Sequence, residues 1–237
     1  MKVAIHQPEC FPWLGFFHKI YLADTFVFLD TVQFEKNNFQ NRNKIKIGKT
    51  GSWLTIPIYD QPLNTQVKDI KINWSDARFA KKHLMTFKQY YSKSPYFNDI
   101  FPFLNQLYSE KIEFLADFNI RFIVFMLEKI GIKTKIVKSS DLTLSGKAQG
   151  GTEVTLEICK MLGANTYISG SGAKVYLDID SYSREKINVY FQEFHHPKYK
   201  QLGQDDFVSH LSILDLYFNH GPKSLEIILD GNIGFIE

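Results

Sequence analysis

The first thirty residues follow a pattern of strand, loop, helix and strand. A short apolar run at residues 3–5 is followed by a polar loop and a helix-like stretch, and a second apolar run occupies residues 26–29. Two strands joined through a helix lie parallel, with a right-handed crossover. Similar apolar runs return at residues 133–138, 165–168 and 186–194, with helix-like stretches between them. This alternation predicts an α/β fold with a doubly wound, mostly parallel sheet of the Rossmann-like type.

A block at residues 76–131 has apolar side chains at helical spacing. Ahead of it we expect short strands at residues 43–47 and 53–58, separated by a turn at residues 48–52. A chain of 237 residues is long enough for one α/β core with an inserted lobe. We therefore expect residues 1–237 to form a single α/β domain with a helical insertion.

Composition narrows the class of protein. The net charge of +3 is too small to indicate a broad nucleic-acid surface. Cys10 and Cys159 do not suggest a disulfide scaffold, which indicates a reducing compartment. The longest apolar run, residues 122–127, is far too short to cross a bilayer, and the N-terminus has no signal-peptide pattern. We expect a soluble cytoplasmic protein with no membrane partner and no zinc-type metal site, and a homo-oligomer is compatible with the sequence.

The most informative stretch lies where the first strand ends. In a parallel sheet, ligands bind at the carboxyl ends of the strands, where the following helices begin. His6 ends the first strand and His18 lies in the first turns of the predicted helix, so both are candidate acid–base catalysts. The same stretch supplies four candidate substrate-binding residues, which are Gln7, Trp13, Gly15 and Lys19. The alternative for each histidine is a structural role in the core.

The second strand ends in another polar segment. Asp30 follows it, so we expect its carboxylate at the same sheet edge as His6, as a third candidate catalytic residue. The loop beyond it carries groups that can pair with phosphate or carboxylate, namely Gln33, Lys36, Asn41 and Arg42. The alternative is a polar surface loop capped by Asp30.

Two later segments add candidate substrate-binding residues. After the strand at residues 165–168, Ser169, Gly170, Gly172 and Lys174 can form an anion-binding nest at the start of a helix, or simply a tight turn that needs glycine. A loop beyond the last strand contains His196, Tyr199 and Gln201. These residues could supply a base, or a surface on which the ring of a sugar packs. Asp215 lies on an otherwise apolar helix, where an unpaired carboxylate is costly, so we expect it to contact a site or another element.

Taken together, these segments resemble the WbqC-like family of bacterial polysaccharide-biosynthesis proteins. The matching pieces are residues 5–8 (IHQP), 12–19 (PWLGFFHK), 29–34 (LDTVQF), 41–42 (NR), 53–57 (WLTIP), 167–170 (YISG) with Gly172 and 176–177 (YL), 196–201 (HPKYKQ), and 211–216 (LSILDL) with 218–219 (FN). The resemblance implies a role in O-antigen, lipopolysaccharide or related glycan synthesis, where some members are thought to attach amino-acid or other acyl groups to amino sugars. A looser likeness links the chain to nucleotidyl-transferase-like folds with a His-x-Gly-His element, although here Phe16 and Phe17 separate Gly15 from His18.

Residues and resemblance together lead to a functional hypothesis. We expect an acyl-transfer enzyme that joins an amino acid such as glycine, or another small carboxylate, to the amine of a nucleotide-linked amino sugar. Asp30 would orient that amine. The acyl donor would be an adenylate made from ATP with Mg, or an activated carrier such as aminoacyl-tRNA. The alternatives are a nucleotidyl- or glycosyl-transferring enzyme, and a non-catalytic module that binds a nucleotide sugar within a glycan pathway.

Overall fold

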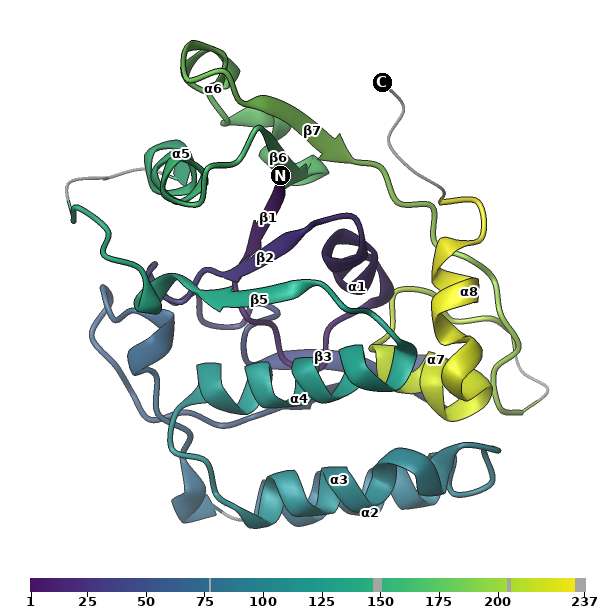
Figure 1. Ribbon diagram of the computed structural model, residues 1–237. Helices are drawn as coiled ribbons and strands as arrows, with labels where there is room; N and C mark the ends of the chain where they lie inside the picture. Colours follow the sequence, from purple (N-terminus) through teal and green to yellow (C-terminus); the bar gives the residue numbers. More distant parts are fainter. Residues whose placement is uncertain (77, 147–150, 204–205, 233–237) are drawn as a thin grey trace.

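A five-stranded parallel sheet forms the centre of the protein in the computed structural model, which describes residues 1–76, 78–146, 151–203 and 206–232. The strand order is β5-β2-β1-β6-β7 (Figure 1). The strands are β1 (Lys2–His6), β2 (Thr25–Phe28), β5 (Lys135–Lys138), β6 (Thr166–Gly170) and β7 (Asn188–Gln192). The predicted α/β, Rossmann-like class is therefore confirmed.

β1 lies in the middle of the sheet because its side chains are apolar on both faces. Val3, Ala4 and Ile5 are at most 3% exposed, as expected for a strand covered by helices on both sides. Val3 pairs with Thr25 of β2 and with Tyr167 of β6. From β1 the chain adds β2 and β5 on one side, and later β6 and β7 on the other. The order of the strands thus reverses between β1 and β6, which is where α/β sheets open a crevice for ligands.

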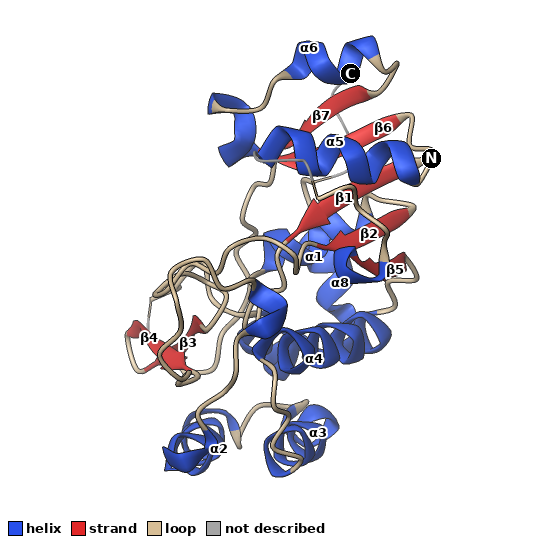
Figure 2. Cartoon of the chain, turned by 90° about the vertical axis from the view of Figure 1, so that its left-hand side faces the viewer, coloured by secondary structure: helices blue, strands red, loops and turns tan. Residues whose placement is uncertain are grey.

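Helices cover both faces of the sheet (Figures 1 and 2). Alternate side chains of a strand point to opposite faces, so Ala4 packs in one apolar cluster and Val3 and Ile5 in the other. The larger cluster includes residues of α1 (Leu14–Tyr21), α4 (Leu115–Ile130), α7 (Ile213–His220) and α8 (Ser224–Leu229). The smaller one includes residues of α5 (Gly151–Met161) and α6 (Ile179–Arg184).

The chain between β2 and β5 builds an antiparallel hairpin and three helices. The hairpin is β3 (Arg42–Ile47) and β4 (Thr50–Thr55), and the helices are α2 (Arg78–Tyr91), α3 (Phe97–Ser109) and α4. These helices lie within the stretch predicted to be helical. The predicted turn at residues 48–52 is wrong, because Ile47 already pairs with Thr50 and the loop is only Gly48 and Lys49. Gly48 permits this tight turn with φ of 60°.

Short 3-10 helices complete the described elements: η1 (Val67–Asp69), η2 (Trp74–Asp76), η3 (Ser139–Asp141), η4 (Ser171–Val175) and η5 (Gly221–Lys223). η4 stands where the sequence predicts a helix after Ser169. None of the helices in the described part of the chain has the length and apolar character that a membrane span requires.

Candidate functional site

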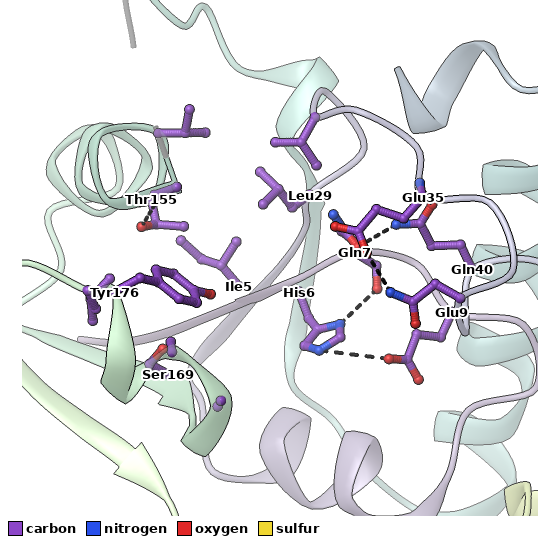
Figure 3. Close-up of a pocket in the computed structure, with 18 of the residues that line it drawn as sticks. Ile5, His6, Gln7, Glu9, Leu29, Glu35, Gln40, Thr155, Ser169 and Tyr176 are labelled. Carbon is purple, nitrogen blue, oxygen red and sulfur yellow. Dashed lines mark hydrogen bonds and ion pairs between the residues drawn. The ribbon is translucent and has the colours of Figure 1, made fainter. Parts of the chain in front are cut away.

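A cavity of about 810 Å³ opens at the carboxyl ends of β1, β2 and β6. We call it the strand-end pocket. Its walls come from the end of β1 (Ile5, His6, Gln7), from residues 29–40 after β2, from β6 with η4, and from α5 (Figure 3). The volume lies within the range that small-molecule sites occupy, and its place beside the reversal in strand order is the expected one for a ligand.

His6 stands in the middle of the strand-end pocket, with its side chain 36% exposed. Its Nδ1–H donates to the Gln7 carbonyl at 3.1 Å, which leaves the lone pair of Nε2 as an acceptor. The ring of Phe16 meets it edge to face at 5.2 Å. Burial, reinforced by the positive charge of Lys19, lowers the pKa of His6 well below its ordinary value. The imidazole is therefore neutral at physiological pH and able to accept a proton.

Two ionisable side chains lie beside His6 in the wall of the strand-end pocket. Glu9 is 7% exposed, with Oε1 3.8 Å from His6 Nε2. Lys19, which is 3% exposed, donates from Nζ to the Ile5 carbonyl at 2.8 Å. Burial raises the pKa of Glu9 to about 8 and lowers that of Lys19 to about 7, and in each case the partner's charge acts in the opposite direction. Burial therefore moves both groups toward their neutral forms near pH 7.

An amide pair forms the neighbouring wall. Gln40 donates from Nε2 to Gln7 Oε1 at 2.5 Å, and its own Oε1 accepts from the backbone of Glu35 at 3.1 Å. Asn119 of α4 donates to the carbonyls of Pro8 and Gln40, at 3.0 and 2.8 Å. One buried amide thus holds the loop after β1 against the loop after β2. Gln33, also in the pocket wall, donates to the Leu63 carbonyl at 2.7 Å.

The opposite wall is built from small residues and rings. Ser169, Gly170 and Gly172 line it together with Thr155 and Tyr176. A Cβ placed on either glycine would meet no described atom within 4 Å, and neither glycine is among those with positive φ. The tight-turn explanation for these glycines is therefore wrong, and their effect is to leave space in the wall. Lys174 lies outside the pocket wall, where its Nζ is 3.4 Å from Glu193 Oε1.

His18 lies outside the strand-end pocket. It is fully buried in the last turn of α1, rather than at the helix start as predicted. Its Nδ1 accepts from Gln192 Nε2 at 2.9 Å, and its Nε2 donates to the Asn232 carbonyl at 3.0 Å. Both ring nitrogens therefore hold distant segments together.

Asp30 is also outside the pocket wall and 2% exposed. Its Oδ1 accepts from Ser139 Oγ at 2.8 Å and from the Ser140 backbone at 2.9 Å, and its Oδ2 accepts from Ser140 Oγ at 2.6 Å. The carboxylate thus links the end of β2 to η3. The strand ends meet as predicted. The Asp30 carboxylate, however, forms its hydrogen bonds with serines that are more than a hundred residues away in the chain.

Trp13 covers Gly15, so the expected approach of a ligand to this glycine is wrong. A Cβ on Gly15 would come within 2.4 Å of the Trp13 indole. The other loop residues named from the sequence also have partners outside the strand-end pocket. Lys36 pairs with Asp60, Asn41 donates to the Ile56 carbonyl, and Arg42 donates to the Asn37 carbonyl while lying over the Trp53 ring.

The late-chain residues form a second cluster around Asp215. Its carboxylate accepts from Tyr91 Oη at 2.8 Å, from Tyr199 Oη at 2.9 Å and from Gln201 Nε2 at 2.9 Å. The predicted contact of Asp215 with another element is confirmed, and it borders a smaller cavity of about 190 Å³. His196 stacks near Trp13, with ring centroids 6.5 Å apart.

Sequence reasoning missed several pocket residues, among them Glu9, Gln40, Thr155 and Tyr176. For Glu9 a signal existed, because it stands three residues after His6 in the loop that follows β1. For Gln40 and Thr155 the sequence carries no comparable signal, since they come from segments that reach the site only through packing. Tyr176 is one of the residues that carry the family resemblance.

The fold and pocket define an α/β protein with a polar pocket at the reversal point of a parallel sheet. The model of the WbqC-like protein family matches residues 7–227, and the chain belongs to this family. It is 32% identical over 226 residues to "Uncharacterized protein Rv1507c" of Mycobacterium tuberculosis, a match that covers 94% of this chain and 95% of that protein. No solved structure matches the chain.

Proposed function

We propose that the chain is an acyl-transfer enzyme that forms an amide between an amino acid, or another small carboxylate, and the amine of a nucleotide-linked amino sugar. The observation that carries this proposal is the neutral His6 imidazole in the strand-end pocket, with the lone pair of Nε2 beside the buried carboxyl of Glu9. Amide formation requires an unprotonated amine, and the Nε2 lone pair of a neutral imidazole can accept the proton that the amine nitrogen loses as the amide bond forms.

The chemistry follows from this arrangement. The amine nitrogen uses its lone pair to attack the carbonyl carbon of the activated acyl group. The bond from that carbon to the leaving group breaks, and the leaving group keeps the bonding electrons. The proton lost by the amine passes to His6 Nε2, whose Nδ1–H remains on the Gln7 carbonyl.

The shape of the strand-end pocket suits a nucleotide-linked ligand. Phe39 and Tyr176 line it while being 42% and 66% exposed, so each offers a ring face or edge to a base or sugar. The space left by Gly170 and Gly172 allows the backbone to approach a phosphate. The acyl donor would be an adenylate made from ATP with Mg, or a carrier such as aminoacyl-tRNA. The place in O-antigen or related glycan synthesis, in the cytoplasm, belongs to the same proposal.

The test is an assay for the amide product. Purified protein is incubated with a dTDP- or UDP-linked amino sugar and either an amino acid with ATP and Mg or an aminoacyl-tRNA, and the product mass is measured. We expect His6→Ala to lower the rate by about 10²–10⁴, the range for a lost acid–base catalyst.

His220→Ala is the matched control, because His220 lies outside the strand-end pocket and its Nε2 donates a hydrogen bond to the Lys200 carbonyl. Its rate should equal that of the wild type. Absence of amide across the common amino sugars and donors would contradict the proposal. Release of AMP or pyrophosphate without amide would favour nucleotidyl transfer instead.

A further inference from the structure

The His6 imidazole and the Glu9 carboxyl face each other in the strand-end pocket without a hydrogen bond between them. His6 Nε2 carries a lone pair, because Nδ1 holds the ring proton. Glu9 Oε1 lies 3.8 Å from it, which is too long for a hydrogen bond. Glu9 Oε2 is buried and has no hydrogen-bond partner among the described residues. A buried carboxyl oxygen without a donor is costly and rare in folded proteins.

The hydrogen bonds of the neighbouring donor groups go to other acceptors. Lys19 Nζ donates to the Ile5 carbonyl, and Gln40 Nε2 donates to Gln7 Oε1. The titratable groups around Glu9 are His6 at the end of β1, Lys19 of α1 and the adjacent Cys10. The His6 Nε2 lone pair and the unpartnered Glu9 oxygen therefore match a ligand that brings its own donors into the pocket.

The number of donors decides which ligand fits. An amine or ammonium group has at least two N–H bonds, so it can donate to His6 and Glu9 at the same time, whereas a hydroxyl has a single O–H. We propose that Glu9 is the residue that makes the strand-end pocket select an amine-bearing ligand over its hydroxyl counterpart. This inference rests on the proposed function, since it assigns Glu9 to the acceptor amine, and it can be tested without acyl transfer.

Binding should also release a proton. Burial raises the pKa of Glu9 to about 8, so its carboxyl is mostly protonated in the empty pocket at pH 7. A ligand that arrives as an ammonium ion favours the carboxylate. Glu9 then gives its proton to solvent, and the ammonium ion remains hydrogen-bonded to the new carboxylate. A hydroxyl ligand has no charge to drive this release.

Isothermal titration calorimetry with matched ligand pairs tests the inference. The pairs are UDP-glucosamine with UDP-glucose, and dTDP-4-amino-4,6-dideoxyglucose with dTDP-6-deoxyglucose. Titrations at pH 7 in phosphate and in Tris give the protons released. In at least one pair we expect the amine to bind about tenfold tighter or better, with a release approaching one proton. Glu9→Gln should abolish both the preference and the release.

Glu128→Gln is the matched control, because Glu128 is exposed on α4 and lies outside the strand-end pocket. It should keep the preference and the proton release. Circular dichroism checks the fold of each variant, and Glu9→Asp serves if Glu9→Gln does not fold. The shorter side chain of Glu9→Asp should weaken amine binding while leaving hydroxyl binding unchanged.

The outcomes separate the two proposals. Equal affinity for amine and hydroxyl ligands in both pairs overturns the role of Glu9, even if the amide product forms. A preference that depends on Glu9, found without any amide product, supports the role of Glu9 and contradicts acyl transfer. Failure of all four nucleotide sugars to bind overturns the role of Glu9.

Discussion

Glu9 and Lys19 are buried ionisable residues whose positions lower the stability of the fold. Each is less than a tenth exposed, and burial shifts both pKa values toward the neutral form. An apolar pair of similar volume would avoid this desolvation cost. Proteins accept such costs at sites where activity needs a strained or destabilised group. The two residues therefore belong with the strand-end pocket rather than with the core.

The pH dependence of stability tests the state of Glu9. The pKa of the Glu9 carboxyl is about 8 in the folded protein, against an ordinary value of 4.5, so the folded state binds an extra proton between these two pH values. Its contribution to stability is thus full below pH 4.5 and is lost as pH rises through 8. We expect Glu9→Gln to gain stability relative to the wild type over this window, by roughly 2 kcal/mol or more, because one pKa unit is worth about 1.4 kcal/mol. Urea denaturation between pH 5 and 9 measures the free energy of unfolding of both proteins. If the free energies of the wild type and of Glu9→Gln changed in parallel with pH, the expectation would be contradicted.

Helix α1 shows how one element carries both core and site. Every residue from Leu14 to Ile20 is buried, so the helix has no face open to solvent over this stretch. Gly15 makes this packing possible, because the indole of Trp13 occupies the space where a Cβ would stand. The indole is in turn packed against Phe194 and His210, at ring distances of 5.3 and 5.7 Å. The glycine thus couples the start of α1 to the loops after β7.

Gly15→Ala should destabilise the protein although alanine is the better helix former. Alanine in a helix interior gains up to about 1 kcal/mol over glycine. Here the Cβ would lie 2.4 Å from the indole, and overpacking of this kind costs about 1–3 kcal/mol. We expect a lower melting temperature and a changed Trp fluorescence spectrum. Gly172→Ala is the control, since its Cβ meets no described atom within 4 Å, and it should leave both measurements unchanged.

At the scale of elements, the sequence predicts well where burial leaves a pattern. The strands β1 and β2 were predictable because both faces are covered and the runs at residues 3–5 and 26–28 within them are apolar and buried. The hairpin was harder, because Thr50, Gly51 and Ser52 of β4 have the composition of a turn but pair with β3. η4 was predicted as an ordinary helix, because small residues after a strand do not distinguish a 3-10 turn from a longer helix.

Over the whole molecule, only part of the candidate site follows from sequence. The strand-end rule placed His6 and Ser169 near one another because it depends on topology alone. It could not exclude His18 and Asp30, whose partners at residues 232 and 139–140 lie far away in the chain. Whether a polar side chain faces a cavity or a structural partner is decided by packing between distant segments, which local sequence does not encode.

The Asp215 cluster ties together the elements that surround the larger apolar core. Tyr91 reaches it from α2 and also accepts from the Lys46 backbone of β3 at 2.9 Å, while Tyr199 reaches it from the loop after β7. Burial raises the pKa of Asp215, while the three donors favour its charged form. The cluster is therefore a structural junction between α2, the hairpin and α7.

A double-mutant cycle tests this junction across the molecule. Tyr91→Phe and Tyr199→Phe each remove one donor to Asp215, and each should lower the free energy of unfolding by about 1–3 kcal/mol. Because both hydroxyls stabilise the same carboxylate, the double variant should differ from the sum by 0.5 kcal/mol or more, as expected for residues in one network. Tyr21→Phe, on an exposed side chain, is the control and should change stability by less than about 0.5 kcal/mol.

The amine-ligand affinity should stay unchanged in all these variants, since the cluster lies outside the strand-end pocket. Strict additivity, or a matching loss of ligand binding, would show that the cluster is not a separate structural junction.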